Sequence, residues 1–124
     1  MLKLIIIISF LASISFAKQY EAVITKVIDG DTVTARINLG LDVLKTETIR
    51  LYGIDAPEMK TEEGKKAHKF LDKLMNGKGV LIDNLNDRRE KYGRLLCKVS
   101  VDGKDVGETI VKAGFARQYF GGVR

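Results

Sequence analysis

The chain has 124 residues, which suits one small domain and is too short for two. Hydrophobic residues make up 45% of the chain and charged residues 30%, a balance that excludes a disordered or fibrous protein. The formal net charge of +5 favours polyanionic partners, such as nucleic acid or anionic lipid, over basic ones. The single cysteine, Cys97, excludes an intramolecular disulfide, and one cysteine with one histidine cannot supply the usual tetrahedral zinc site.

The first 17 residues predict an export signal. A basic start precedes a largely apolar run from Leu4 to Ala17, and the small residues Ser15 and Ala17 suit cleavage after Ala17. The alternative is an uncleaved membrane anchor, but the run is short for a span of about 20 residues. We therefore expect a signal peptide at residues 1–17 and a mature domain at residues 18–124. This mature protein should be secreted or periplasmic, monomeric, and without stable membrane association.

The first half of the mature chain predicts three strands. Tyr20 to Ile28 is rich in β-branched residues, and Asp29-Gly30 is a turn signal before Thr32 to Leu39, where apolar and polar residues alternate. These two strands predict a hairpin. A third strand is predicted at Lys45 to Ile54, and Ala56-Pro57 ends it because the residue before a proline prefers extended geometry.

A helix is predicted next, from Thr61 to Asn76, with Gly77 as its C-cap. Its apolar residues fall at spacings that line one face: Ala67, Phe70, Leu71, Leu74 and Met75.

The rest of the chain predicts two more strands and a short helix. They are Gly79 to Leu85, Leu95 to Val101 after a charged loop at Asn86 to Arg94, and, after a turn at Asp102-Gly103, a helix from Val106 to Ala113 ended by Gly114. Five short strands with a helix after the third favour an α+β, mainly β, fold: a five-stranded OB-type Greek-key barrel with flanking helices. Composition alone does not separate this barrel from other small α+β folds.

The first candidate cluster of functional residues is Ile28 to Thr32 (IDGDT), where two carboxylates flank a glycine. Asp-Gly is a common hairpin turn, so taken alone the segment is more typical of a turn than of a site. Asp29 is expected to close this turn, with a possible contribution to the charge of the site.

The second cluster is Ile49 to Glu58 (IRLYGIDAPE), with an arginine and two carboxylates at a strand end around the only proline. Strict alternation along a strand would put Arg50 and Asp55 on opposite faces. They can converge only if the strand bends near Gly53 or if the turn begins at Asp55.

The third cluster is Lys91 to Arg94 (KYGR), which taken alone is more often a solvated loop than a site. Together the three clusters form a chemically complete set. Asp31 and Asp55 are hard oxygen donors suited to Ca²⁺ or Mg²⁺, and two arginines can hold a phosphate by forked hydrogen bonds. Glu58 could orient or deprotonate a water, and Tyr92 could stack on a base.

In these three segments the sequence resembles the staphylococcal nuclease (thermonuclease) family, with the signature segments in the same order and with similar separations. The resemblance covers Tyr20 to Phe120. It implies Ca²⁺-dependent hydrolysis of phosphodiester bonds in DNA and RNA, leaving 3′-phosphate ends. The residues that it assigns are Asp31, Asp55 and the backbone carbonyl of Ala56 as metal ligands, Glu58 as general base, Arg50 and Arg94 on the scissile phosphate, and Lys91 and Tyr92 on a neighbouring nucleotide.

The chain departs from this family at its end. Members usually continue into a C-terminal helix that packs on the barrel, whereas this sequence stops at Arg124. We therefore expect that helix to be missing or truncated. A second aromatic residue that stacks on the substrate is not fixed by the sequence, since Tyr119 and Phe120 are both candidates.

Four other residues are expected to be structural or solvent-facing. His68 lies beside the apolar stripe of the helix as a boundary side chain, and Cys97 is expected to be a small buried hydrophobic residue. Arg88 and Arg89 either form an electrostatic approach surface or belong to a solvated loop.

The main rival to a nuclease is an OB module that binds nucleic acid without catalysis. A degenerate copy should have lost carboxylates or arginines, and a purely structural barrel would have no reason to gather them. All five are present: Asp31, Arg50, Asp55, Glu58 and Arg94.

Overall fold

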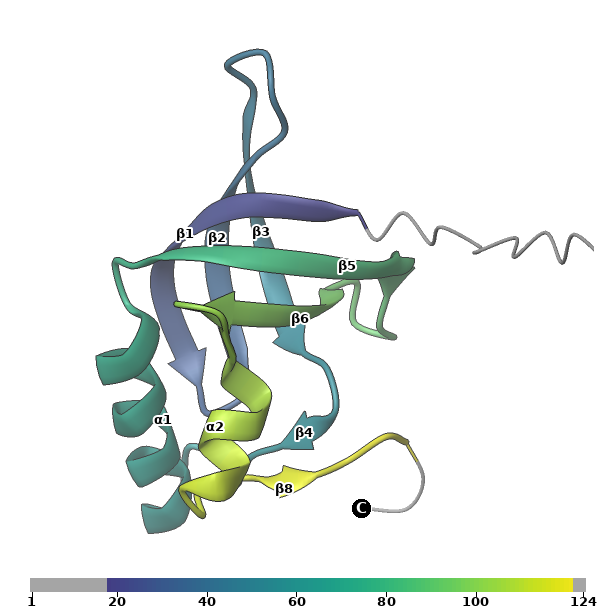
Figure 1. Cartoon of the computed structure of the whole chain (residues 1–124). Coiled ribbons are helices and arrows are strands. Elements are labelled where there is room, and N and C mark those ends of the chain that lie inside the picture. The colour runs from purple at the N-terminus through teal and green to yellow at the C-terminus, as the bar shows by residue number, and fades with distance from the viewer. Residues whose placement is uncertain (1–17, 122–124) are drawn as a thin grey trace, which may run out of the picture.

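Five strands form a closed barrel (Figure 1). The computed structural model describes residues 18–121, and of residues 86–88 it describes the backbone alone. The barrel strands are β1 (Gln19–Asp29), β2 (Thr32–Asn38), β3 (Leu44–Leu51), β5 (Gly79–Arg89) and β6 (Leu95–Val101). Neighbours in the order β3-β2-β1-β5-β6 are antiparallel, and a parallel pairing of β3 with β6 closes the sheet. The predicted OB-type barrel is thus confirmed.

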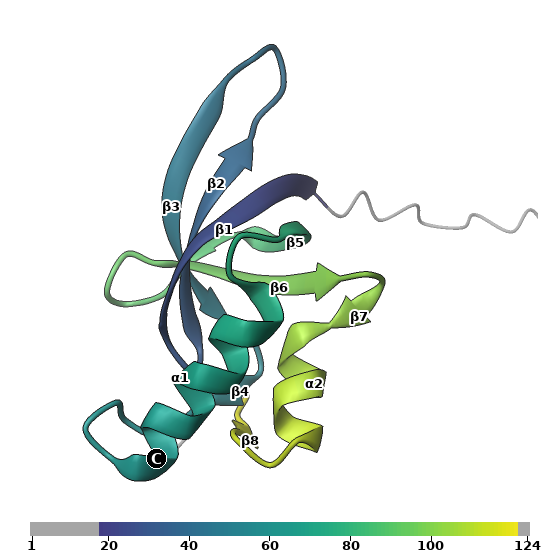
Figure 2. The ribbon, with the colours of Figure 1, turned by 90° about the vertical axis from the view of Figure 1, so that its left-hand side faces the viewer.

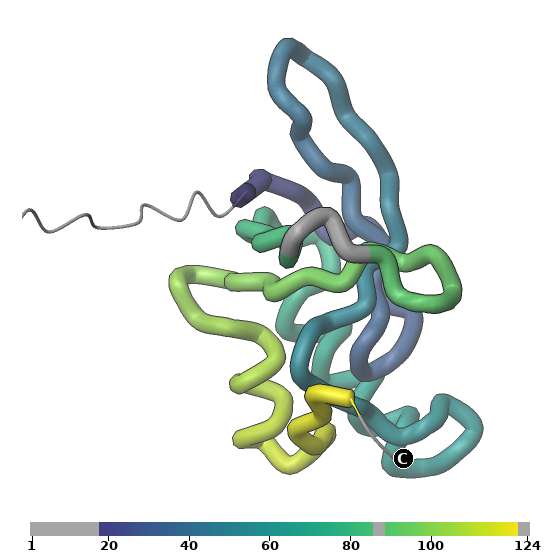
Figure 3. The backbone as a smooth tube through the Cα atoms, turned by 90° about the vertical axis from the view of Figure 1, so that its right-hand side faces the viewer, coloured from purple at the N-terminus to yellow at the C-terminus, as the bar shows by residue number. Residues whose placement is uncertain are grey.

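Two helices and three two-residue strands complete the fold. The helices are α1 (Glu62–Met75) and α2 (Val106–Lys112), and the short strands are β4 (Ile54–Asp55), β7 (Lys104–Asp105) and β8 (Arg117–Gln118). β8 pairs antiparallel with β4, so the end of the described chain lies beside the segment that follows β3 (Figures 1 and 3). Figure 2 shows α1 and α2 at one end of the barrel and the β2–β3 hairpin projecting from the other.

The barrel and α1 share one hydrophobic core. The buried face of α1 is formed by Gly64, Ala67, Leu71 and Met75. Thr61 caps its first turn, because its hydroxyl oxygen accepts a hydrogen bond from the Gly64 N–H. Gly77 follows the helix at φ 77°, a left-handed conformation that is typical after a helix end. The predicted helix is therefore confirmed to within one residue at each end, but its C-cap is Asn76, and Gly77 is the residue after the cap.

Two predicted boundaries were wrong. The strand predicted from Lys45 to Ile54 is two strands, β3 and β4, because the chain bends at Gly53 with φ 81°. The loop predicted from Asn86 to Arg94 is shorter, since β5 continues to Arg89. There Arg89 is in register with Leu95 and donates two hydrogen bonds to Glu47 on β3.

Two predictions concern the ends of the chain. The predicted signal peptide at residues 1–17 lies outside the described residues, and so does the chain beyond Gly121, where the family helix would follow. From residue 18 to residue 121, no helix is both long and apolar enough to span a membrane.

Candidate active site

The turn between β1 and β2 sets the first carboxylate in place. The Asp29 side chain accepts a hydrogen bond from the Asp31 N–H at 3.0 Å, which closes the turn as predicted. Gly30 has a different role from the one that a turn motif suggests. A Cβ atom on Gly30 would lie 2.7 Å from the Cβ atoms of both Ala56 and Ala67. Glycine is therefore required here so that the turn can pack against the second cluster and against α1.

Asp31 is buried, with 8% of its surface exposed, and both of its carboxylate oxygens are engaged. Oδ1 accepts from the Thr32 hydroxyl at 2.9 Å, and Oδ2 accepts from the Ala56 N–H at 2.9 Å. Burial, followed by the neighbouring Asp29 carboxyl, raises the pKa of Asp31 above its ordinary value, and these causes outweigh the Ala56 N–H and the Arg50 charge. The first and second clusters are thus joined by a direct hydrogen bond.

The bend at Gly53 brings Arg50 and Asp55 together. Nη2 of Arg50 lies 3.5 Å from Oδ1 of Asp55 and 3.4 Å from Oδ2 of Asp31. Arg50 is 7% exposed, and it also donates to the carbonyls of Leu51 (2.9 Å) and Ile54 (2.7 Å). Of the two ways in which the side chains could converge, the structure has the bend. One buried guanidinium therefore sits between the two predicted metal ligands.

Arg117 is a site residue that the sequence analysis missed. Asp55 pairs with Arg117 across β4 and β8, and Nη2 of Arg117 lies 3.3 Å from Oδ2 of Asp55. Asp55 therefore contacts a different arginine through each of its oxygens. No motif marks Arg117, because its contact with Asp55 depends on the pairing of two strands that are only two residues long.

Arg94 is held by Glu90, a second site residue that the sequence did not indicate. Nε and Nη2 of Arg94 donate to the two oxygens of Glu90 at 3.0 and 3.1 Å, and Nη1 donates to the Thr32 hydroxyl at 3.2 Å. The Arg94 guanidinium lowers the pKa of Glu90 to about 2, and Glu90 in turn raises the pKa of Arg94. Thr32 follows Asp31 directly, so this contact links the third cluster to the first.

Lys91 and Tyr92 lie at the open edge of the site. Tyr92 is 72% exposed, and Lys91 Nζ and Arg94 Cζ lie 5.0 and 5.5 Å from the centroid of its ring. These are cation–π distances, and they leave most of the ring accessible.

A groove of about 630 Å³ runs past both arginines. Its wall includes both candidate stacking residues, Tyr119 and Phe120, and the Phe120 ring centroid lies 5.6 Å from that of Tyr52. The residues that line the groove are Arg50, Leu51, Tyr52, Gly53, Ile54, Glu90, Lys91, Tyr92, Arg94, Leu96, Tyr119, Phe120 and Gly121. It combines two guanidinium groups with several aromatic faces.

Glu58 is the one predicted catalytic residue that the structure does not bring into contact with the others. Its side chain is 73% exposed and pairs with Lys60 at 3.1 Å. The backbone of this loop is fixed: the Glu58 carbonyl accepts from the Thr61 N–H and hydroxyl, and a Cβ on Gly64 would clash with that carbonyl. The loop is therefore anchored to α1 while the Glu58 carboxylate faces solvent.

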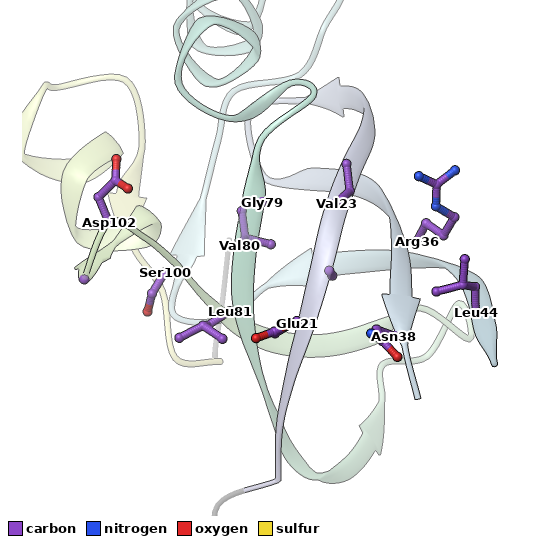
Figure 4. Close-up of a pocket in the computed structure, with 12 residues that line it drawn as sticks. Glu21, Val23, Arg36, Asn38, Leu44, Gly79, Val80, Leu81, Ser100 and Asp102 are labelled. Atoms are coloured by element: carbon purple, nitrogen blue, oxygen red, sulfur yellow. The ribbon is translucent and has the colours of Figure 1, made fainter. Parts of the chain in front are cut away.

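A separate hollow of about 590 Å³ lies over β1, β5 and the adjoining ends of β2, β3 and β6 (Figure 4). Its charged residues are Glu21, Arg36 and Asp102. None of the predicted site residues lines it, so it is distinct from the groove.

The carboxylates fit a calcium ion in part. One oxygen of Asp31 and one oxygen of Asp55 form ion pairs with the same nitrogen of Arg50. The distance between these two oxygens is therefore at most the sum of the two ion-pair distances. Carboxylate oxygens are ligands that Ca²⁺ prefers. Among the side chains that the structure describes, no group of three or more His, Cys, Asp or Glu residues could hold a metal. A calcium ion here would therefore draw on two carboxylates, and its other ligands would be carbonyl oxygens or water.

Of the remaining residues singled out in the sequence, His68 and Cys97 lie outside the candidate site and have the boundary and core positions that were predicted for them. His68 is half-buried, and its Nε2 lies 2.9 Å from the Val27 carbonyl. Cys97 is buried, and this burial raises the pKa of its thiol to about 12, as expected for an inert core residue. Arg89 pairs with Glu47 rather than lying in a solvated loop. The Arg88 side chain lies outside what the structure describes.

Comparison with known proteins agrees with this geometry. The family described as "Staphylococcal nuclease homologue" matches residues 48–123, which include the second and third clusters. Endonuclease YncB of Bacillus subtilis (strain 168) is 40% identical over 107 residues, which are 81% of this chain and 48% of that protein. The SPbeta prophage-derived endonuclease YokF of the same strain is 40% identical over 104 residues, or 78% of this chain and 33% of that protein.

A third relative, an uncharacterized endonuclease of Escherichia coli O157:H7, is 36% identical over 97 residues. These are 77% of this chain and 59% of that protein, so the chain spans less than two thirds of the length of each of these three relatives. The matched residues cover more than half of this chain and contain Arg50, Asp55 and Arg94. On its fold and on this match, the chain belongs to the staphylococcal nuclease homologue family.

Proposed function

We propose that this protein is an exported, Ca²⁺-dependent nuclease that hydrolyses phosphodiester bonds of DNA, RNA or both and leaves 3′-phosphate ends. The observation that carries the proposal is the buried Arg50 guanidinium, held between Asp31 and Asp55 at the wall of a groove that Arg94 also lines. Burying a charge is costly, so three ionised groups gathered at a groove favour a functional site over a merely structural one.

The two arginines are assigned to the scissile phosphate. Their charges are balanced by Asp31, Asp55 and Glu90, and each guanidinium can turn some of its donors toward an entering phosphate. As negative charge builds on the phosphoryl oxygens, a contact that strengthens in the transition state lowers the barrier. A bound Ca²⁺ would supply further positive charge beside the same phosphate.

Glu58 is assigned to the attacking water, as its general base or as the group that orients it. This assignment is supported by its position three residues after Asp55, in a loop whose backbone is anchored to α1. Its exposed carboxylate can change partners without breaking a buried contact, since its ion pair with Lys60 lies at the surface.

The groove is assigned to a nucleotide next to the scissile phosphate. Tyr92 and Phe120 offer exposed aromatic faces for stacking, and Lys91 offers a cation for a phosphate. Stacking tolerates every base, so this arrangement favours a nuclease of broad sequence preference.

Purified protein should be incubated with heat-denatured DNA and with RNA, with Ca²⁺ and with excess EGTA. We expect cleavage only with Ca²⁺, and product ends that a polymerase extends only after phosphatase treatment. Tight binding without any cleavage would instead support the non-catalytic OB module. If a polymerase extends the product ends without phosphatase treatment, the 3′-phosphate assignment is wrong while the nuclease function stands.

The export part of the proposal rests on residues 1–17 and has its own test. N-terminal sequencing of protein recovered from outside the cytoplasm should find Lys18 first. Recovery of protein that still begins at Met1 would favour a membrane anchor.

A further inference from the structure

A second pocket, of about 530 Å³, shares no lining residue with the groove, but Ile54 in the groove wall and Asp55 in the pocket wall are consecutive residues of β4. Asp55 belongs to this pocket, and its ion pair with Arg50 joins the two hollows. The wall comes from the loop after β4, from α1, and from the segment between α2 and β8, which lie together at one end of the molecule (Figures 1 and 2). The lining residues are Asp55, Ala56, Pro57, Glu63, Lys66, Gly114, Phe115, Ala116 and Arg117.

We propose that this pocket is a second nucleotide subsite, which binds the nucleotide on the side of the scissile phosphate away from the Tyr92 groove. The inference rests on the proposed nuclease function and adds substrate contacts from Lys66, Phe115 and Arg117, which lie outside the three signature segments. A polynucleotide continues on both sides of the bond that is cut. If its phosphate lies on Arg50, one neighbour enters the groove and the other meets the surface beyond Asp55.

The charged side chains of the pocket suit a nucleotide on this side of the scissile phosphate. Lys66 is exposed on α1, and among the described residues no acidic side chain pairs with it. The Arg117 side chain is 57% exposed and has its Cζ 5.9 Å from the centroid of the Tyr119 ring, which lines the groove. These two cations can contact a phosphate, while Glu63 can accept a hydrogen bond from a base amino group.

The walls between the cations suit a sugar and a base. Pro57, Ala116 and Phe115 supply apolar surface, and the Phe115 ring is held by stacking on Phe70, with ring centroids 4.8 Å apart. A pocket that combines apolar walls with two cations favours a nucleotide over a free inorganic anion, which would gain nothing from those walls.

Lys66→Ala tests the subsite, because Lys66 lines this pocket and does not line the groove. Binding should be measured by fluorescence anisotropy in a Glu58→Gln background, in which the proposed role of Glu58 predicts slow cleavage, and the length of the probe should be checked after each titration. The two probes are a single-stranded oligothymidylate, which is long enough to occupy both hollows, and a thymidine bisphosphate, which is too short to occupy both and is expected in the groove that the two arginines line. Lys73→Ala is the matched control: it removes the same charge from the same helix about two turns away.

We expect Lys66→Ala to weaken oligonucleotide binding about fivefold or more while leaving thymidine bisphosphate binding unchanged, and Lys73→Ala to change neither by more than about twofold. Equal effects of the two substitutions on the oligonucleotide would overturn the subsite. An Ala116→Leu variant, which narrows the pocket without changing charge, should show the same selectivity for the longer probe. If the parent protein binds and cuts DNA but these variants behave like the control, only the subsite is wrong. If the parent neither binds nor cuts, the proposed function itself fails.

Discussion

Phe120 packs against the bend at Gly53: a Cβ on Gly53 would lie 2.9 Å from Cε1 of the Phe120 ring. The Tyr119 N–H donates to the Gly53 carbonyl at 2.9 Å, so the segment after β8 braces the bend through both backbone and side chain. The bend in turn sets Arg50 against Asp55. The end of the described chain is therefore part of what shapes the candidate site.

Gly53→Ala should destabilise the fold and lower activity together. Gly53 has φ 81°, which costs an alanine about 1 kcal/mol or more, and the added methyl group would also displace Phe120. Gly40→Ala is the control, since Gly40 has a similar φ of 85° but no atom within 4 Å of the added Cβ. Thermal unfolding and DNA hydrolysis should be measured for both variants. If Gly53→Ala were as stable as Gly40→Ala and hydrolysed DNA at the parent rate, the bend at Gly53 would not be what positions the site.

Calcium should raise the stability of the protein and be required for cleavage. Asp31 and Asp55 lie close together, and a cation that binds the folded state shifts unfolding by linkage. Asp31→Asn and Asp55→Asn should each need more Ca²⁺ for half-maximal activity, and should show a smaller rise in melting temperature with Ca²⁺. A calcium titration followed by both readouts checks this. Undiminished cleavage in excess EGTA and EDTA would remove the metal from the proposal.

Acid should destabilise the protein between about pH 4.5 and pH 2, in part through Glu47. Hydrogen bonds from Arg89 and then from Lys45 lower the pKa of Glu47 from 4.5 to about 2. Since the folded-state pKa is the lower one, the stabilisation is present above the unfolded pKa and is lost as pH falls through the folded value. Glu90, whose pKa is also about 2, adds an effect of the same sign.

Melting temperatures across this range check the assignment. Glu47→Gln should melt lower than the parent at pH 7, and the difference should shrink toward pH 2. Glu62→Gln, at an exposed pair with Lys65 on α1, is the control and should follow the parent at every pH. A constant difference for Glu47→Gln across the range would show that its ionisation does not contribute.

Much of the fold followed from local pattern. Alternating residues predicted β2, β-branched residues followed by a turn signal predicted β1, and the apolar stripe from Thr61 to Asn76 predicted α1, because these signals depend on neighbours a few residues apart. The pairing of β4 with β8 was not predictable, because two-residue strands carry no periodic signal and form only where the barrel brings them together. Arg117 was missed for that reason.

The candidate site was also predictable only in part: the sequence indicated most of its residues but not the contacts between them. Asp31, Arg50, Asp55 and Arg94 were recognised from residue type and motif, but their convergence depends on tertiary contacts. The role of Gly30 is an example: its Asp-Gly context predicted only a turn, whereas its missing side chain lets Ala56 and Ala67 approach. Glu90 gave no signal either, since a glutamate in a charged loop is ordinarily solvated, and its function as the partner of Arg94 appears only in the folded loop.

The most direct test of the account is the rate of DNA hydrolysis by Arg50→Lys and Arg94→Lys, compared with Arg36→Lys. Lysine keeps the charge but loses the planar fork that holds a phosphate. Arg36 lines the separate hollow of Figure 4, so its substitution removes a guanidinium outside the groove. We expect the first two variants to keep their fold and lose about two to four orders of magnitude in rate, roughly 3–5 kcal/mol of transition-state stabilisation, while Arg36→Lys stays near the parent. Hydrolysis by folded Arg50→Lys and Arg94→Lys at the rate of Arg36→Lys would contradict the account and place the phosphate site elsewhere.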